Sequence, residues 1–461
     1  MTSVVLSNPV RRERPYRIPS RQGKRYLVRT FGCQMNEHDS ERVAGLFEAD
    51  GMVPADGYED ADVVFINTCT IRENADNKLY GTIGNLKAVK DVNPSMMLVV
   101  GGCAAQKDRE IVRERAPWVD VVLGTHNLDR VVDLLDHADA WGPITEVVDE
   151  LHAMPSSLPV KRELAHSAWV TIQVGCNNTC TFCIVPAVRG VEVSRRPGDI
   201  LQEVRSLVAD GVVELTLLGQ NVDTYGRDLA LDGKRKPLFA ELLRQVGAVE
   251  GVRRVRFTSP HPNDFRPEVA EAMAATPAVC EQLHFPLQSG SDRILARMHR
   301  GYTAGRYLER LAMARDIIPD LSVSSDIIVG FPGETEEDFE RTLEVVAEAR
   351  FDSAFTFIFS SRPGTAAAEM AGEFVDPDVV NERFQRLLAV QNDLTESNSQ
   401  RWVGRTLEVL SEGPSRKNPG VATTRTRGGK VVHVAGDIPA GTFLDATITG
   451  SSMHHLAGDP A

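Results

Sequence analysis

The sequence predicts an α/β protein with an N-terminal open parallel-sheet domain, a central partial TIM-like (β/α)6 barrel and a small C-terminal β-barrel. Three observations carry this prediction. Short apolar runs alternate with segments of helical period, these runs lack polar alternation, and the chain closes on β-rich segments separated by Gly, Pro, Ser and Asn. Strands buried by helices on both faces are typical of parallel sheets. A chain of 461 residues also exceeds the usual size of one core, which favours two or three domains.

The first α/β region spans residues 25–140 and contains apolar runs at 26–29, 63–66, 97–100 and 119–123. We expect these runs to form an open parallel sheet covered by helices on both faces. Residues 1–24 are rich in arginine and contain prolines, so we expect a disordered basic tail and assign it no function. Residues 141–166 contain three prolines and are expected to form a linker.

The second α/β region spans residues 167–400, with apolar runs at 168–174, 212–218, 253–258, 282–287, 321–329 and 354–359. Six such units separated by helical segments predict an incomplete TIM-like barrel. Residues 377–401 are expected to form one long helix, with Pro377 in its first turn. Residues 401–461 are expected to form a small all-β domain with strands near 406–410, 430–434 and 444–449.

The cysteines indicate metal binding or catalysis. The chain has seven of them, no secretory signal, and no run approaching the roughly 18 to 20 apolar residues that span a bilayer. We therefore expect a cytoplasmic protein without membrane contact, in which cysteines do not form a disulfide framework. Cys280 has no cysteine neighbour in sequence and is interpreted as a packed thiol.

Cys176, Cys180 and Cys183 form a Cys-x3-Cys-x2-Cys loop directly after an apolar run that ends at Val174. This order places the loop at the catalytic end of the predicted barrel. Three thiolates can hold three irons of a 4Fe-4S cluster and leave the fourth iron open to a small molecule. The alternatives are a zinc site or free thiols, but zinc sites normally have four ligands and no nearby residue completes this one.

Cys33, Cys69 and Cys103 each follow one of the first three predicted strands by a few residues. The carboxyl ends of parallel strands line one crevice, so these thiols are expected to converge there. Convergence would create a second, auxiliary 4Fe-4S site with an open iron. The alternative is three independent buried cysteines.

Charge is unevenly distributed along the chain. The net charge is −13, yet residues 401–433 contain seven basic residues and two acidic ones. Such a stretch is either an anion-binding surface or a solvated face. The stretch includes Arg416, Lys417, Arg425 and Arg427.

The cysteine loop, with the aromatic Phe182 before its last cysteine, resembles the radical S-adenosylmethionine superfamily. From about residue 25 to 456 the chain further resembles the methylthiotransferase family, which combines two three-cysteine sites with a small β-domain. The matching motifs are residues 31–36 (FGCQMN), 67–72 (NTCTIR), 101–104 (GGCA), 259–262 (SPHP), 286–291 (PLQSGS) and 330–335 (GFPGET). One departure is Ala187, where many relatives carry Tyr.

The resemblance implies two 4Fe-4S clusters and S-adenosylmethionine as cofactors. S-adenosylmethionine would bind the open iron at Cys176, Cys180 and Cys183 and undergo one-electron cleavage, while the auxiliary cluster would hold the sulfur. The implied contacts with S-adenosylmethionine are Gly219, Gln220 and Asn221 for its methionine end, Ser324 and Asp326 for its ribose, and Gly330 for its adenine. Each of these six positions is also a plausible barrel-strand terminus without a ligand.

Residues 34–36 (QMN) and 412–418 (EGPSRKN) resemble the branch of the family that modifies tRNA. That branch uses two S-adenosylmethionine molecules to convert N6-isopentenyladenosine beside the anticodon to its 2-methylthio form. The C-terminal domain is similar to the TRAM domain, which binds RNA, so the resemblance implies Arg416, Lys417, Arg425 and Arg427 as candidate contacts with RNA phosphates. The implied partners are tRNA, an electron donor such as flavodoxin or ferredoxin, and a sulfur source, and we expect a monomer.

Two alternatives remain at this stage. The first is a methylthiotransferase for an aspartate of a ribosomal protein or for threonylcarbamoyl-adenosine in tRNA, because all such enzymes need the same two clusters. The second, from another class, is a non-enzymatic iron–sulfur sensor that binds RNA.

Overall fold

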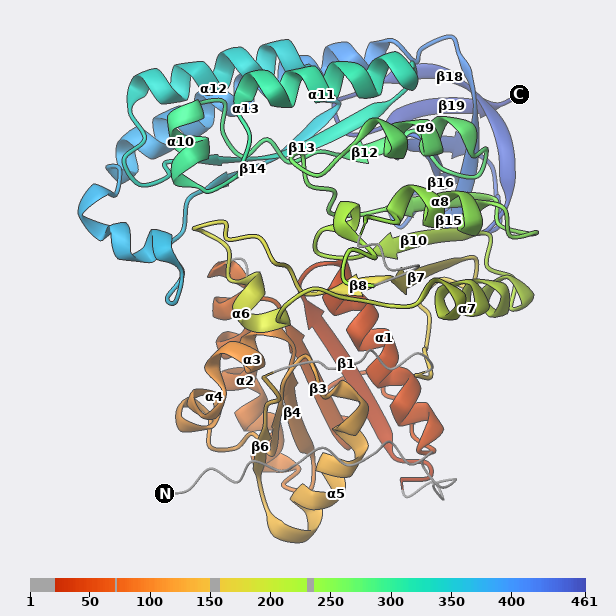
Figure 1. Ribbon diagram of the computed structural model, residues 1–461. Helices are drawn as coiled ribbons and strands as arrows, with labels where there is room; N and C mark the ends of the chain where they lie inside the picture. Colours follow the sequence, from red (N-terminus) through yellow and green to blue (C-terminus); the bar gives the residue numbers. More distant parts are fainter. Residues whose placement is uncertain (1–20, 71–72, 150–157, 230–235) are drawn as a thin grey trace.

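The computed structural model describes residues 21–70, 73–149, 158–229 and 236–461. The N-terminal sheet lies below the barrel in Figure 1, and its central strands point toward the barrel and the short helix α6. The predicted open sheet, partial barrel and small β-barrel are all confirmed. Residues 1–20, the larger part of the predicted basic tail, and residues 71–72 of the NTCTIR motif lie outside the described residues.

The N-terminal domain contains a six-stranded parallel sheet in the order β2-β1-β3-β4-β5-β6. Its strands are β1 (Arg25–Phe31), β2 (Val53–Pro54), β3 (Val63–Thr68), β4 (Met97–Gly101), β5 (Val121–Leu123) and β6 (Ile144–Glu146). The sequence reading located the four inner strands and missed the two edge strands, which have two and three residues. Strand β6 lies in the segment that we expected to be a linker.

Helices cover both faces of this sheet, as predicted. On one face, α1 (Gln34–Ala49) and α5 (Val131–Trp141) pack on apolar side chains that include Val43, Phe47 and Phe65. On the other face, α2 (Glu73–Val92), α3 (Cys103–Asp108) and α4 (Glu110–Arg115) pack on the alternate side chains of the same strands. Every residue of β3, β4 and β5 is therefore buried whichever way it points, which explains their unbroken apolar runs.

Residues 21–24 correct one boundary of the expected disordered tail. Arg21 is 8% exposed and its guanidinium contacts Asp50, Asp136 and Asp139 at 3.4, 2.7 and 2.8 Å. The backbone N–H of Gly23 also donates to Gly51. These contacts hold residues 21–24 against the N-terminal domain, because three carboxylates compensate the buried cation.

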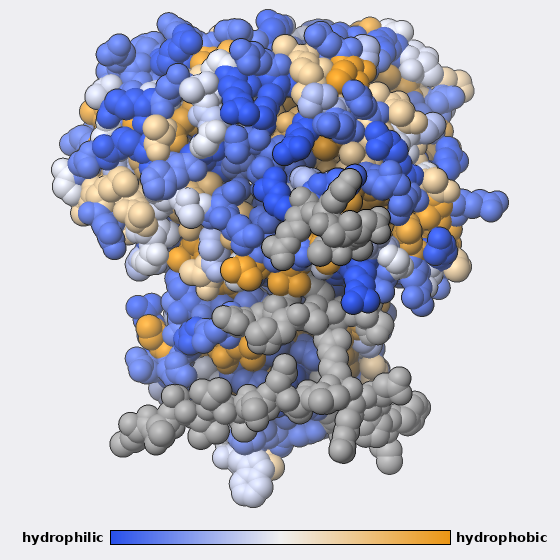
Figure 2. Space-filling model, in the orientation of Figure 1, coloured by the Kyte–Doolittle hydropathy of each residue, from blue (hydrophilic) through white to orange (hydrophobic). Residues whose placement is uncertain are grey.

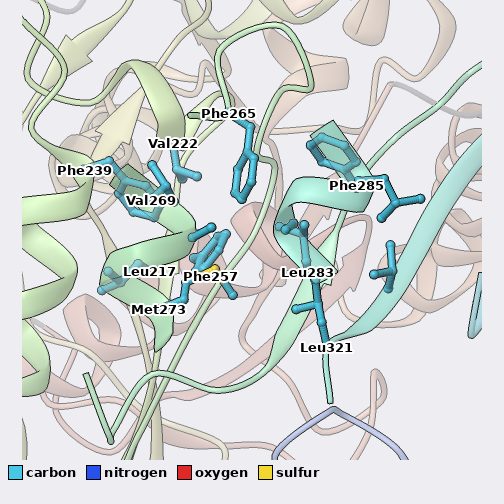
Figure 3. Packing of buried hydrophobic residues seen from close by; sticks show 14 of the residues in the cluster. Leu217, Val222, Phe239, Phe257, Phe265, Val269, Met273, Leu283, Phe285 and Leu321 are labelled. Atoms are coloured by element: carbon cyan, nitrogen blue, oxygen red, sulfur yellow. The ribbon is translucent and has the colours of Figure 1, made fainter. Parts of the chain in front are cut away.

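The central domain is the expected partial barrel of six parallel strands. They are β7 (Ser167–Thr171), β10 (Glu214–Leu218), β11 (Arg254–Phe257), β12 (Gln282–His284), β13 (Ser322–Val329) and β14 (Ser353–Ile358). The order is β7-β10-β11 in one sheet and β12-β13-β14 in another, and a parallel bridge between Val255 and Val279 joins them. Aromatic and aliphatic side chains from both sheets fill one core (Figure 3).

Helices cover the outside of this barrel (Figure 1). They are α7 (Pro197–Ala209), α8 (Phe239–Gly247), α9 (Pro267–Ala275), α10 (Asp292–Arg297), α11 (Ala304–Ile317), α12 (Glu336–Ala349) and α13 (Pro377–Gln400), with η3 (Ala366–Glu373) before the last. Asp376 caps α13 by accepting from the N–H of Asp378, and Pro377 occupies the first turn as predicted. Within the residues described, no helix combines the length and apolar composition that a membrane crossing requires.

A short hairpin positions the cysteine loop of the barrel. Strand β8 (Gln173–Val174) pairs with β9 (Val193–Ser194), and α6 (Val185–Arg189) lies between them. Gly175, just before Cys176, has φ +78°, and an added Cβ would lie 2.0 Å from the Val191 carbonyl oxygen. Glycine is therefore required where the chain turns from the strand into the cysteine loop.

The C-terminal domain is a closed barrel in the order β15-β16-β17-β19-β18. Its strands are β15 (Thr406–Pro414), β16 (Val421–Thr426), β17 (Val431–Ala435), β18 (Phe443–Ser451) and β19 (Leu456–Pro460). Three of them were expected, whereas β16 and β19 were missed because Thr, Arg, Gly and Asp interrupt their apolar pattern. This barrel packs against one end of the central domain (Figure 1).

Candidate metal centres

Three cysteines from the N-terminal domain converge at the carboxyl edge of its sheet. Cys33 precedes α1, Cys69 directly follows β3, and Cys103 begins α3 after β4. The thiol of Cys69 forms hydrogen bonds with both Cys33 and Cys103. The structure therefore brings together the three residues that strand order predicted to meet, and it does so in one thiol cluster.

Two of the three thiols of this auxiliary site favour the thiolate form that binds metal. Hydrogen bonding to Cys69 lowers the pKa of Cys33 to about 6 and that of Cys103 to about 7, and the nearby Arg189 guanidinium acts in the same direction. The pKa of Cys69 is raised, because it is the thiol that keeps its proton between the other two. Thiolates are the form that binds iron, so the donor set fits a cluster held by three cysteines.

Two asparagines of the cysteine motifs support this site. Asn36 and Asn67 are buried and joined by a hydrogen bond of 2.9 Å from Nδ2 of Asn36 to Oδ1 of Asn67. The Cys33 thiol donates to Asn36 Oδ1 at 3.4 Å. Asn67 also donates to Ser40 at 2.9 Å, so the amides link β3 to α1 beneath the thiols.

The barrel cysteines form the second site. The Cys176 N–H donates to the Gly190 carbonyl at 3.1 Å, and the Cys183 N–H donates to the Cys180 carbonyl at 3.0 Å, so the loop folds back on itself. Thr181 anchors the loop to the end of α10, since its N–H and hydroxyl donate to the carbonyls of Met298 and Arg297. The three cysteines therefore share one compact loop at the carboxyl end of the first barrel strand.

The barrel thiols are partly buried, and in the described part of the chain Arg300 supplies the positive charge beside them. Burial raises the pKa of Cys176 to about 11 and that of Cys183 to about 12. Arg300 donates to the Cys180 sulfur through Nη1 at 3.3 Å. Bound iron would offset the cost of burying three thiolates, so this loop also fits a cluster.

Arg300 is a site residue that the sequence reading missed. It is 7% exposed, and its Nε donates to the Tyr302 hydroxyl at 3.2 Å. That hydroxyl in turn donates to the carbonyls of Pro286 and Leu287 at 3.0 and 2.9 Å. No spacing in the sequence connects Arg300 with Cys180, because 120 residues separate them and only the barrel brings them together.

The residues expected to contact the methionine end of S-adenosylmethionine lie next to the cysteine loop. The Gln220 side-chain oxygen accepts from the N–H of Gly175 at 2.5 Å, which ties residues 219–221 to the loop. Asn221 is fully buried and donates to Asp264 at 2.9 Å. Its Oδ1 atom is buried and has no hydrogen-bond partner in the described part of the chain. Gly219 packs against Val222 and Gln173.

The residues expected near the ribose share a histidine. His284 on β12 contacts the Ser324 hydroxyl through Nδ1 at 3.0 Å and Asp326 through Nε2 at 3.3 Å. His284 was not among the predicted residues, although its place on the strand before β13 could have suggested it. Gly330 has φ +76°, and an added Cβ would lie 2.6 Å from Val380 on α13. The absence of a side chain at Gly330 therefore allows α13 to pack closely against the end of β13.

The basic stretch of the C-terminal domain is mostly engaged in ion pairs. Arg427 is held by both carboxylate oxygens of Glu281 at 2.8 Å, and Arg425 contacts Glu412 at 2.7 Å. Arg401, Arg405 and Lys430 also pair with carboxylates, those of Asp352, Asp320 and Asp352. Arg416 and Lys417 are exposed and have no ion pair within the described residues. Much of the local positive charge thus joins this domain to the barrel.

Comparison with known proteins agrees with this arrangement. A model of the Radical SAM superfamily matches residues 170–346, and a model of the Uncharacterized protein family UPF0004 matches residues 25–124. The chain is 54% identical over 449 residues to the tRNA-2-methylthio-N(6)-dimethylallyladenosine synthase of Parafrankia sp., covering 95% of this chain and 90% of that protein. It is 53% identical to the synthase of that name from Saccharopolyspora erythraea, covering 94% and 89%.

Solved structures share the fold at low sequence identity. The radical S-adenosylmethionine methyltransferase TsrM from Kitasatospora setae is 14% identical, with a TM-score of 0.54 and 75% of each chain covered. The cobalamin-dependent S-adenosylmethionine radical enzyme OxsB is 11% identical, with a TM-score of 0.51 and coverage of 82% of this chain and 61% of that one. These likenesses concern the fold alone. From its sequence relatives and its two cysteine sites, the chain belongs to the tRNA-2-methylthio-N(6)-dimethylallyladenosine synthase family of radical S-adenosylmethionine enzymes.

Proposed function

We propose that this protein adds a methylthio group to C2 of N6-isopentenyladenosine adjacent to the anticodon of tRNA. The observation that carries the proposal is the pair of three-cysteine sites, one in each α/β domain, in a chain that matches synthases of this name along nearly its whole length. The adenine C2–H is an unactivated aromatic bond that acid–base side chains cannot break, so cofactors must carry the difficult step.

Cys176, Cys180 and Cys183 would hold one 4Fe-4S cluster, and Cys33, Cys69 and Cys103 would hold the auxiliary one. When bound, the clusters and two S-adenosylmethionine molecules supply reductive bond cleavage, a methyl group and the transferred sulfur. One site would lie at the carboxyl end of the N-terminal sheet and the other at the carboxyl end of the first barrel strand, with Cys69 and Cys103 buried and the other four thiols partly buried. Arg300 donates a charged hydrogen bond to Cys180, which stabilises negative charge at that sulfur.

We propose Gly219, Gln220, Asn221, Ser324, Asp326 and Gly330 as contacts of S-adenosylmethionine. The hydrogen bond from Gly175 to Gln220 supports the first three, because it places that strand end against the cysteine loop. The unpartnered Asn221 Oδ1 is a buried acceptor that an ammonium or hydroxyl group could satisfy. Ser324 and Asp326 carry polar groups on β13 beside His284.

For tRNA, we propose phosphate contacts from the C-terminal β-barrel. Arg416 and Lys417 are the strongest candidates, because both are exposed between β15 and β16 and lack ion pairs in the described part of the chain. Arg425 could contribute only by sharing its guanidinium with Glu412, and Arg427 only by leaving Glu281. We further propose a monomer in the cytoplasm that receives electrons from flavodoxin or ferredoxin and sulfur from a separate source.

A substrate panel tests this proposal. The anaerobically reconstituted protein would be incubated with S-adenosylmethionine, reductant and sulfide, and with one of three substrates: isopentenylated tRNA, tRNA carrying threonylcarbamoyl-adenosine, or ribosomal protein. Mass spectrometry should detect 2-methylthio-isopentenyladenosine with the first substrate alone. Methylthiolation of another substrate would make that alternative correct, and RNA binding without any cleavage of S-adenosylmethionine would favour the sensor.

A further inference from the structure

The side chain of Arg189 connects the two cysteine sites. Arg189 is the last residue of α6, the helix that follows the barrel's cysteine loop, yet its guanidinium contacts the N-terminal domain. Nη1 lies 2.8 Å from Oδ2 of Asp39 on α1, and the two side chains are 5% and 4% exposed. An ion pair this deeply buried contributes little net stability, since desolvation offsets the attraction. We therefore interpret it as a contact that orients α6 relative to α1.

The same guanidinium faces the auxiliary thiols. Its positive charge lowers the pKa of both Cys103 and Cys33. Cys103 packs against Ile184 and Val188, which belong to the same loop and helix as Arg189. The barrel segment that carries the radical-site cysteines therefore also forms one wall of the auxiliary site.

One donor of Arg189 has no acceptor. Its Nη2 atom is buried and makes no hydrogen bond within the described ranges. Leaving such a donor unpaired costs about 1–3 kcal/mol, so an acceptor is expected there in the working enzyme. A cluster held by three thiolates is negatively charged and presents sulfur acceptors, and hydrogen bonds to its sulfurs help to set its reduction potential.

We propose that Arg189 is a positioning residue for the auxiliary cluster, supplied by the barrel: it donates to sulfur at the Cys33–Cys69–Cys103 site and, through Asp39, fixes α6 against α1. The inference rests on the proposed function only in that this site holds a cluster. The positive charge of Arg189 makes the reduced auxiliary cluster easier to form, and the Arg189–Asp39 ion pair holds the two cysteine sites at a constant separation.

The test measures the auxiliary cluster alone. Cys176, Cys180 and Cys183 are replaced by Ala in the full chain, the protein is reconstituted anaerobically, and the cluster is titrated by EPR. Arg189→Gln is expected to shift the ratio of reduced to oxidised cluster at least tenfold toward the oxidised form, about 59 mV for a one-electron couple. Arg189→Lys should retain most of the native ratio, and Arg196→Gln, at an exposed arginine, should leave it unchanged.

Several outcomes would overturn the inference. One is an Arg189→Gln variant that binds the auxiliary cluster and shows the same ratio of reduced to oxidised cluster as Arg196→Gln. Another is an Arg189→Lys variant in which this ratio shifts as far as it does in Arg189→Gln. If Arg189→Gln binds no cluster, Arg189→Lys decides: retained cluster and potential support the role of the charge, and equal loss of cluster refutes it. Because this readout needs neither tRNA nor cleavage of S-adenosylmethionine, a wrong substrate assignment would leave it unaffected.

A second readout tests positioning in the enzyme with all six cluster cysteines. Arg189→Gln and Asp39→Asn should keep formation of 5′-deoxyadenosine close to the native level, because the barrel loop is intact. Both should lower the methylthiolated product by about 10-fold to 100-fold, the usual cost of losing an outer-shell partner of a metal site. Equal loss of both products in both variants would contradict a positioning role.

Discussion

Each three-cysteine site has one buried arginine beside a ligand thiol. Arg300 contacts Cys180 within the barrel domain, and the charge of Arg189, also in the barrel domain, lowers the pKa of Cys103 in the N-terminal domain. A guanidinium keeps its charge at any working pH and offers several directed donors, which suits it to sulfur sites that carry excess electrons. The two arginines therefore compensate part of the negative charge of the thiolate ligands.

Replacing Arg300 tests this role at the barrel site. Arg300→Gln should slow formation of 5′-deoxyadenosine about tenfold or more, because a hydrogen bond between charged groups contributes about 1.5–3 kcal/mol. The measurement is the rate of 5′-deoxyadenosine formation under excess reductant. Arg306→Gln, at an exposed position on α11, serves as the control. Equal rates in the two variants, with equal iron content, would contradict the role.

Asp223 gives a pH-dependent prediction. This carboxyl in η2 (Val222–Thr224) is 1% exposed and accepts from the His261 N–H at 2.8 Å; burial raises its pKa to about 8. The native state thus binds the proton more tightly than the unfolded state, so the stability that the neutral carboxyl gives is complete below about pH 4 and is lost as pH rises toward 8.

Asp223→Asn should remove this dependence, because an amide keeps the acceptor and does not ionise. Urea unfolding of the apoprotein is measured at pH 5 and pH 8. Between these two pH values, the free energy of unfolding of the variant should rise by about 1–3 kcal/mol relative to that of the native protein. Asp393→Asn, at an exposed position, should show no such change. A constant difference between Asp223→Asn and the native protein would contradict the raised pKa.

At the scale of elements, two arginines of β11 dock the C-terminal barrel. Arg254 is fully buried and donates to the carbonyls of Arg425 and Glu408 and to the Glu408 carboxylate. Arg256 donates to the carbonyls of Thr426 and Arg427. The contacts run from one strand of the central domain to β15 and the end of β16, so the small barrel is fixed in position rather than tethered by α13 alone.

Arg254→Met should therefore loosen this domain. We expect a loss of about 3 kcal/mol in the free energy of unfolding, because Glu408 and two carbonyls lose a buried cationic donor. Hydrogen exchange should quicken in β15 and β16, while β3 and β4 of the N-terminal domain stay protected. Arg253→Met removes the neighbouring exposed arginine and should cost less than about 1 kcal/mol. Similar exchange in the two variants would contradict the docking role.

The elements that the sequence revealed are those whose local pattern is strong. The long helix from Pro377 and the buried inner strands were predicted because period and burial agree along each segment. Strands β2 and β6 were missed because they are edge strands of two and three residues, and β16 and β19 were missed because polar residues and glycine interrupt their apolar pattern. The ion pairs of the basic stretch could not be predicted, because the acidic partners of Arg401, Arg405 and Arg427 lie in the barrel, far away in sequence.

At the scale of the whole molecule, the N-terminal sheet lies below the barrel, and its central strands point toward the barrel and α6 (Figure 1). The face shown in Figure 2 is mostly hydrophilic, with hydrophobic residues where the barrel meets the N-terminal domain. Strand order was enough to predict that Cys33, Cys69 and Cys103 converge and that the loop of Cys176, Cys180 and Cys183 follows the first barrel strand. It could not predict the mutual placement of the two sites, because the Arg189–Asp39 contact that joins them is visible only once both domains are folded.

The central claim is a division of labour between the two sites. It is tested most directly by quantifying 5′-deoxyadenosine and 2-methylthio-isopentenyladenosine in the same anaerobic reaction for the native protein, Cys180→Ala and Cys69→Ala. The account predicts that Cys180→Ala yields neither product, whereas Cys69→Ala yields 5′-deoxyadenosine without the methylthiolated nucleoside. Equal loss of both products in both variants would contradict it.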